Sequence, residues 1–119
     1  MKSLRVLVVE DEALVAMLVE QAVEDNGDTV AATASDIQGA MHYAATLDFD
    51  VALLDLNLHG QKAHAVPAVI RARKKPFAFV TGYGDAGVLA AFTDAPIVAK
   101  PFRTADIAKA LAVLRSQCQ

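Results

Sequence analysis

The sequence has only one cysteine, Cys118, among its 119 residues. A single cysteine can form neither an intrachain disulfide nor a cysteine zinc site, which favours a reducing compartment, with the cytoplasm as the default location. No apolar stretch approaches the roughly 20 residues that span a bilayer. The first apolar run, residues 6–9, is too short for a signal peptide and is followed at once by acidic residues. The sequence therefore predicts a soluble protein with no membrane partner.

Positive charge is scarce as well, because 11 basic residues face 14 acidic ones and the formal net charge is −3. This balance argues against a surface built to hold nucleic acid. The chain has no repeats, linkers or low-complexity segments, so its length predicts one domain, residues 1–119. Hydrophobic residues make up 55% of the sequence, which supplies a core without disulfides or structural metals.

Four apolar runs of strand length recur along the chain, at residues 4–9, 51–54, 77–80 and 97–99. Short runs of nearly continuous apolarity are typical of parallel strands that are covered on both faces. A weaker run at residues 28–34 contains two threonines and is interpreted as an edge strand. The sequence thus predicts five strands.

Helical patterns separate these runs. We expect helices over residues 12–25, 36–47, 61–74, 85–92 and 104–117. Pro67 should kink or delay the third helix, and glycines at 82, 84 and 87 should weaken the fourth. Alternating strands and helices with right-handed crossovers predict an α/β fold with an open, doubly wound sheet. Ligands of such sheets bind at the carboxyl ends of the strands.

Polar residues stand at these strand ends. Glu10 and Asp11 follow the first strand, Asp55 ends the third, Thr81 ends the fourth and Lys100 follows the last. Each alone has an ordinary explanation as a helix cap, a strand residue or a surface charge, but together they converge on one edge. Three adjacent carboxylates repel one another unless a cation neutralises them, and an all-oxygen acidic cluster suits Mg²⁺. The sequence therefore predicts a magnesium site.

Asp55 is the candidate nucleophile of this site. Leucines flank it on both sides, so it stands where a buried strand emerges, a position that stability alone would not give to an acid. A carboxylate that attacks a phosphoryl group needs a divalent cation, a fixed ammonium and a hydroxyl donor around the phosphate oxygens. Lys100 and Thr81 supply the ammonium and the hydroxyl.

With these motifs the sequence resembles the receiver domains of two-component response regulators across essentially its whole length. The matching residues are Glu10-Asp11, Asp55 after a buried strand, Thr81-Gly82 and Lys100-Pro101-Phe102. Residues 76–85, PFAFVTGYGD, resemble the signature of the FAT GUY subfamily of stand-alone receivers, with Val80 at its alanine position. The resemblance implies a flavodoxin-like receiver fold with five parallel strands in the order 2-1-3-4-5, helices on both faces and no output domain.

The resemblance also implies roles for individual residues. Asp55 would be phosphorylated, and Mg²⁺ would bind Asp11, Asp55 and the backbone carbonyl of Asn57, with Glu10 reaching it through water. Thr81 would act in switching. Around the phosphoryl group we expect Asn57, Gly82 and Tyr83, and we expect a cis peptide bond between Lys100 and Pro101.

The sequence departs from the family pattern in two places. Leu58-His59-Gly60-Gln61 replaces the usual Met-Pro and following glycine, and Ile97 stands where the family commonly has a switching aromatic residue. Because Ile97 has neither ring nor hydroxyl, we expect the switch to lie in residues 82–92. Ordering of this segment after phosphorylation would present Tyr83 to a partner.

Several functions remain open on the sequence. The first is a signalling switch that a histidine kinase or phosphotransfer protein phosphorylates and that then binds an unidentified downstream protein. The second is a phosphorelay intermediate or phosphate sink, which phosphoryl half-life would distinguish from a switch. A small Mg²⁺-dependent phosphatase is disfavoured because 119 residues leave no cap over a substrate. A receiver that is not phosphorylated is disfavoured because every reactive position is filled. We expect no enzymatic activity beyond the domain's own phosphoryl transfer and autodephosphorylation.

Three further groups of residues receive structural interpretations. The apolar run Ala13 to Val19 could dock a partner helix, although core packing is favoured. His42, His59 and His64 are assigned to the surface because their spacing does not bring them together with the acids. The basic residues from Arg71 to Lys75 are interpreted as complementing a helix dipole rather than binding a partner.

Overall fold

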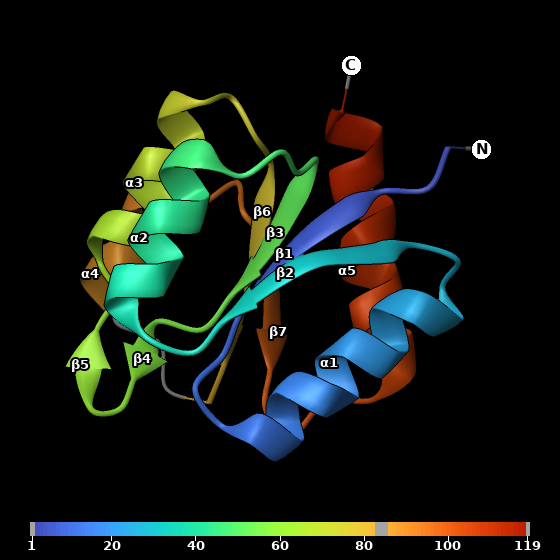
Figure 1. Cartoon of the computed structure of the whole chain (residues 1–119), viewed down its shortest axis with the longest axis horizontal. Helices are drawn as coiled ribbons and strands as arrows, with labels where there is room; N and C mark the ends of the chain where they lie inside the picture. The colour runs from blue at the N-terminus through green and yellow to red at the C-terminus, as the bar shows by residue number, and fades with distance from the viewer. Residues whose placement is uncertain (1, 83–85, 119) are drawn as a thin grey trace.

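The computed structural model describes residues 2–82 and 86–118 and has a central sheet between two layers of helices (Figure 1). Five strands pair in parallel in the order β2-β1-β3-β6-β7. These are the five predicted strands in the predicted order. The labels β4 and β5 belong to a separate hairpin. Their bounds are β1 (Arg5–Val9), β2 (Thr29–Ala34), β3 (Val51–Leu54), β6 (Phe77–Thr81) and β7 (Ile97–Ala99).

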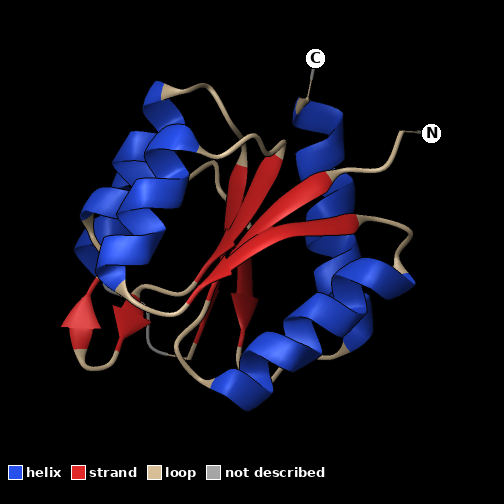
Figure 2. Ribbon diagram, in the orientation of Figure 1, coloured by secondary structure: helices blue, strands red, loops and turns tan. Residues whose placement is uncertain are grey.

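Helices cover both faces of this sheet, as the doubly wound prediction requires (Figure 2). The helices α1 (Ala13–Asp25) and α5 (Thr104–Gln117) lie on one face, and α2 (Ile37–Thr46), α3 (Ala65–Ala72) and α4 (Ala86–Ala91) lie on the other. The predicted bounds of α5 are confirmed. The first residue of the predicted fourth helix, residue 85, lies outside the described residues. None of the helices in the described ranges is both long and apolar enough to cross a membrane.

The two-sided cover explains why the central strands are apolar at nearly every position. Successive side chains of a strand point to opposite faces. Val6 and Val8 of β1 therefore join the core beneath α1 and α5, whereas Leu7 and Val9 join the core beneath α2 and α3. All four residues of β3 are buried. The sheet thus leaves only its strand ends for polar chemistry.

The predicted helix over residues 61–74 is wrong in its first turn. Residues there form an antiparallel hairpin, β4 (Asn57–Leu58) and β5 (Gln61–Lys62), and α3 begins only at Ala65. Gln61 and Lys62 pair with Leu58 and Asn57 as an extended strand, so the helix can begin only after them. Pro67 lies in the first turn of α3, where its missing N–H would have no helical partner, so it is accommodated without a kink.

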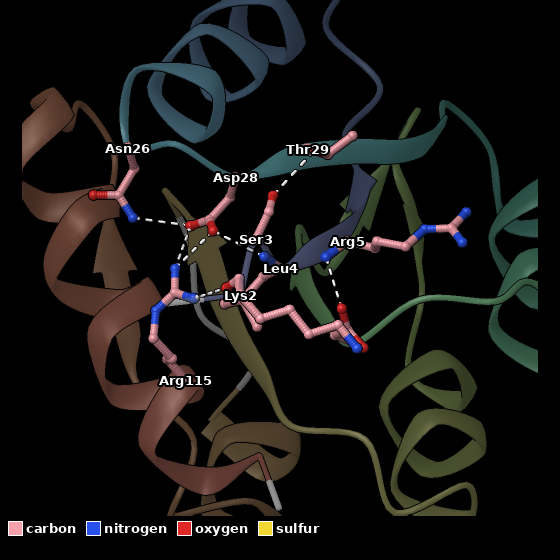
Figure 3. Close-up of polar contacts among 9 residues, drawn as sticks. Lys2, Ser3, Leu4, Arg5, Asn26, Asp28, Thr29 and Arg115 are labelled. Atoms are coloured by element: carbon pink, nitrogen blue, oxygen red, sulfur yellow. Dashed lines mark hydrogen bonds and ion pairs between the residues drawn. The ribbon is translucent and has the colours of Figure 1, made fainter.

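A polar cluster fastens the opposite, amino end of the sheet (Figure 3). Both carboxylate oxygens of Asp28 accept hydrogen bonds from Nη2 of Arg115, at 2.6 and 2.8 Å. The backbone N–H of Leu4 and the side-chain amide of Asn26 also donate to this carboxylate, each at 2.9 Å. Burial would raise the pKa of Asp28, but these hydrogen bonds outweigh it and the pKa is lowered. The cluster ties the last turn of α5 to the starts of β1 and β2.

Candidate functional site

The residues predicted at the strand ends come together at the carboxyl edge of the sheet. Glu10, Asp55 and Thr81 are buried, and Lys100 is partly buried. They surround a cavity of about 210 Å³ beside the ends of β3, β6 and β7. Its lining residues are Asp11, Glu12, Asp55, Asn57, Thr81, Gly82 and Lys100.

The three acids form a compact cluster. Carboxylate oxygens of Glu10, Asp11 and Asp55, one from each, all lie within 4.8 Å of one another. Two of these acids come from the β1 end and the third from the β3 end, and the parallel pairing of these strands brings them together. An all-oxygen donor set that opens into a small polar cavity suits a hard cation such as Mg²⁺. The residues present therefore fit the predicted metal.

Lys100 lies between two of these carboxylates. Its Nζ is 2.6 Å from Oε1 of Glu10 and 2.9 Å from Oδ2 of Asp55. Burial would lower the pKa of this ammonium, but hydrogen bonds to Glu10 and Asp55 outweigh it and the pKa is raised. Lys100 is therefore charged at neutral pH and neutralises part of the cluster.

The same surroundings favour the neutral form of Glu10, whereas they favour the charged form of Lys100. Burial raises its pKa to about 6 from 4.5, and the hydrogen bonds from Lys100 and Glu12 reverse only part of that effect, while the nearby charge of Asp55 adds to it. One ammonium thus leaves three neighbouring carboxylates incompletely neutralised. The remaining negative charge is what a bound divalent cation would relieve.

Backbone N–H groups hold the other two acids. The N–H of Asn57 donates to Oδ1 of Asp55 at 3.0 Å, and the N–H of His59 donates to Oδ2 of Asp11 at 2.7 Å. Burial would raise the pKa of Asp11, but the His59 N–H and a hydrogen bond with Glu10 outweigh it and the pKa is lowered. Asp11 therefore stays ionised and available as a ligand.

His59 is a residue that the sequence analysis missed. It was assigned to the surface, apart from the acids, and its side chain is indeed exposed. However, its Nδ1 lies 3.7 Å from Oδ2 of Asp11, and its N–H contacts the same oxygen. The one available signal was the replacement of the family's proline by histidine, which restores a backbone N–H at this position.

The remaining site residues lie around the cavity. Thr81 ends β6, and its carbonyl accepts the backbone N–H of Lys100 at 3.2 Å. Gly82 is exposed at the cavity, and the peptide bond between Lys100 and Pro101 is cis. Ile97 is 56% exposed on β7. Tyr83, together with part of the segment expected to switch, lies outside the described residues.

The first helix carries an exposed apolar face next to the cavity. Leu14, Met17 and Leu18 are 67%, 62% and 54% exposed. Interpreting the run from Ala13 to Val19 as core is therefore wrong for these three residues, because α1 turns only part of its circumference to the sheet. Beside this face lies an open groove of about 450 Å³. Its lining residues are Glu12, Val15, Leu18, Gly82, Lys100, Pro101 and Phe102.

Comparison with known proteins gives a consistent result. A family model described as the response regulator receiver domain matches residues 6–112. A search of curated proteins returns no match. The chain is 38% identical to SdrG from Sphingomonas melonis Fr1. The match covers 97% of this chain and 99% of SdrG, and the TM-score with the solution structure of SdrG is 0.84.

Two further solved structures resemble the chain. The BeF3-activated conformation of SdrG, from Pseudomonas melonis Fr1, is 40% identical over 96% of this chain and 98% of that one, with a TM-score of 0.77. The receiver domain of the response regulator PhyR from Erythrobacter litoralis is 26% identical over 100% of this chain and 95% of that one, with a TM-score of 0.83. The subfamily indicated by residues 76–85 fits the match to SdrG.

Proposed function

Because the chain belongs to the response regulator receiver domain family, we propose that it is a stand-alone receiver that accepts a phosphoryl group on Asp55. One observation carries this proposal. Asp55 is a buried carboxylate at a strand end, 2.9 Å from the ammonium of Lys100 and within 4.8 Å of two further acids. A buried acid among other acids is costly for stability, and this arrangement is suited to a nucleophile whose charge a cation offsets.

The proposed donor is a phosphohistidine of a histidine kinase or phosphotransfer protein. A carboxylate oxygen of Asp55 forms a bond to phosphorus while the P–N bond of the donor breaks, and the electron pair of that bond returns to the imidazole nitrogen. Lys100 then pairs with a phosphoryl oxygen in place of the carboxylate oxygen that it contacts here. The Thr81 hydroxyl, at the end of β6, donates to another oxygen.

The proposal includes Mg²⁺ at the acidic cluster. Asp11, Asp55 and the backbone carbonyl of Asn57 would hold it, with Glu10 reaching it through water. When bound, the cation neutralises phosphate oxygens as charge moves onto them. The cavity of about 210 Å³ beside these residues has room for a phosphoryl group together with the cation.

The exposed face of α1 is the proposed docking surface for the phosphoryl donor. Leu14, Met17 and Leu18 are apolar and exposed, and the groove beside them continues to Gly82 and Lys100 at the site. A donor protein must bring its phosphohistidine within bonding distance of Asp55, so its contact surface must adjoin the cavity. An apolar patch at this place fits that requirement.

The proposed output is a change in protein binding. Ile97 offers neither an aromatic ring nor a hydroxyl, so we assign the switch to the backbone that follows Thr81, residues 82–92. Movement of the Thr81 hydroxyl toward the phosphoryl group would shift the attached Gly82. Whether the domain serves as a switch or as a relay depends on phosphoryl half-life, since a long-lived phosphoryl group supports output by binding.

The decisive experiment is intact-mass measurement after incubation with acetyl phosphate and Mg²⁺. The wild-type chain should gain the mass of one phosphoryl group, and Asp55→Asn should gain none. Lys2→Ala, at an exposed residue away from the site, is the matched control and should be labelled like wild type. Labelling of Asp55→Asn, or undiminished labelling in excess chelator, would overturn the assignment.

A further inference from the structure

The β4–β5 hairpin has a turn that requires positive φ from a histidine as well as from a glycine. Leu58 pairs with Gln61, so His59 and Gly60 are its two loop residues, with φ of 51° and 76°. Positive φ at both central residues is what a type I′ turn requires. Glycine adopts this conformation readily, whereas histidine does so at a cost in backbone energy. The left-handed backbone at His59 is therefore maintained by contacts elsewhere.

Those contacts are made with the acids of the site. The N–H of His59 points to Oδ2 of Asp11 at 2.7 Å, and two residues earlier the N–H of Asn57 points to Oδ1 of Asp55 at 3.0 Å. One short stretch of backbone thus holds an oxygen of each of two carboxylates that come from different strands. Positive φ at His59 and Gly60 then turns the chain back toward β5 directly after this N–H, and a proline at residue 59 would have no N–H to donate.

The hairpin is itself anchored to the rest of the fold. Leu58 is 1% exposed and packs in the core beneath α2 and α3. The N–H of Ala63 donates to the carbonyl of Leu56 at 2.8 Å and closes the base of the hairpin. Because both ends are fixed, the peptide that carries the His59 N–H keeps its place only if the two loop residues can turn the chain back to β5.

We propose that the β4–β5 hairpin is a positioning element of the metal site, in which the backbone N–H of His59, held in place by the left-handed turn that follows it, fixes the Asp11 carboxylate relative to Asp55. This inference rests on the proposed function, since the cation concerned is its Mg²⁺. His59 acts here through its backbone N–H. Its side chain, which is 64% exposed, is not required. Loss of such an outer contact to a ligand typically costs about 10- to 100-fold in metal affinity.

A substitution series at His59 tests the proposal by isothermal titration of Mg²⁺, with no phosphoryl donor present. His59→Val introduces a β-branched residue that resists positive φ, and it should raise the Kd for Mg²⁺ about tenfold. His59→Asn and His59→Gly both tolerate positive φ and should stay within about twofold of wild type. Recovery by these two variants separates the backbone from the imidazole.

Lys74→Val is the matched control. Lys74 is the other non-glycine residue with positive φ in the described part of the chain, at 60°, and it is exposed after α3. Its N–H donates to the carbonyl of Arg71 and not to a site carboxylate. Lys74→Val should therefore lower the midpoint of thermal unfolding about as much as His59→Val, while its Kd for Mg²⁺ stays at the wild-type value.

The outcomes are distinguishable. Equal Kd values for His59→Val and Lys74→Val, with wild type binding Mg²⁺, would overturn the inference alone. Equal losses in the valine, asparagine and glycine variants would assign the effect to the imidazole and overturn it as well. A wild-type chain without affinity for Mg²⁺ would overturn the proposed function and the inference together. If His59→Val does not fold, His59→Ala provides the same comparison with a smaller strain.

Discussion

At the amino ends of the strands a single buried carboxylate, Asp28, receives hydrogen bonds from a guanidinium, an amide and a backbone N–H. At the carboxyl ends, three carboxylates gather around Lys100, which pairs with only two of them. The pKa of Asp28 is lowered and that of Glu10 is raised to about 6. The two ends of one sheet therefore differ: the charge of the carboxylate is neutralised at the first, whereas the second keeps negative charge that the proposed Mg²⁺ would offset.

The largest expected effect is at the amino end. Asp28→Ala leaves the Arg115 guanidinium and the Leu4 N–H without their partner, and Arg115 is only 22% exposed. Breaking a buried pair in this way should lower the free energy of unfolding by about 3 kcal/mol, measured by urea denaturation at pH 7. Asp48→Ala removes only an exposed pair with Arg5 and should change stability little. Equal effects of the two variants would contradict the comparison.

Addition of Mg²⁺ should have the next largest effect, and only through the carboxyl end. At a concentration one hundred times its Kd, Mg²⁺ should raise the free energy of unfolding by about 2.7 kcal/mol, because it binds the folded state. Asp11→Asn removes a charged ligand and should reduce this gain, whereas Asp48→Ala should retain it. Thermal unfolding with and without Mg²⁺ measures both. An undiminished gain in Asp11→Asn would show that the cation acts elsewhere.

The pH dependence of stability sharpens the comparison further. Because the folded-state pKa of Glu10 is above its ordinary value, the folded state binds more protons, and stability without Mg²⁺ should fall as pH rises from about 4.5 to about 6. The total loss should be up to about 2 kcal/mol. The lowered pKa values of Asp28 and Asp11 act in the opposite direction, but only at pH values below about 4.

Glu10→Gln provides the control for this window. The variant cannot ionise at residue 10, so its stability should be level between these pH values and should exceed that of wild type above pH 6. Urea denaturation at a series of pH values without divalent cations makes the measurement. A wild-type profile that is flat between pH 4.5 and 6 would remove Glu10 as a source of unrelieved charge.

The smallest effect is expected at Ile97. This side chain is exposed on the edge strand, so Ile97→Ala should change the free energy of unfolding by no more than about 0.5 kcal/mol. If the switch lies in residues 82–92, the variant should also keep the wild-type backbone amide shift changes on adding beryllofluoride. Loss of those changes in the variant would indicate that residue 97 takes part in the switch.

The sequence predicted the strands and the strand-end residues because both follow from general rules. Strands buried on two faces must be apolar throughout, and parallel strands must end at a common edge. Those rules suffice to gather Glu10, Asp55 and Lys100 from distant parts of the chain. They do not predict a hairpin whose turn needs positive φ from a histidine, and nothing local indicates that the N–H of this histidine contacts Asp11, 48 residues earlier.

The pairing of Asp28 with Arg115 was equally beyond prediction. The two residues are far apart in the sequence, and nothing in the local pattern distinguishes either from an ordinary surface charge. The exposed face of α1 was misjudged for a related reason. Seven apolar residues in a row indicate a buried helix, but only the packing of α1 on the sheet decides which of them remain exposed.

The cluster at Asp28 also determines where a label or tether can be attached to the domain. Arg115 donates to the carbonyl of Lys2 at 2.7 Å as well as to Asp28, so the two ends of the chain are fastened side by side (Figure 1). Lys2 and Arg115 lie at the amino edge of the sheet, opposite the acidic cluster. A surface tether or fluorescent reporter joined near either residue would therefore leave the cavity beside Asp55 open to a phosphoryl donor.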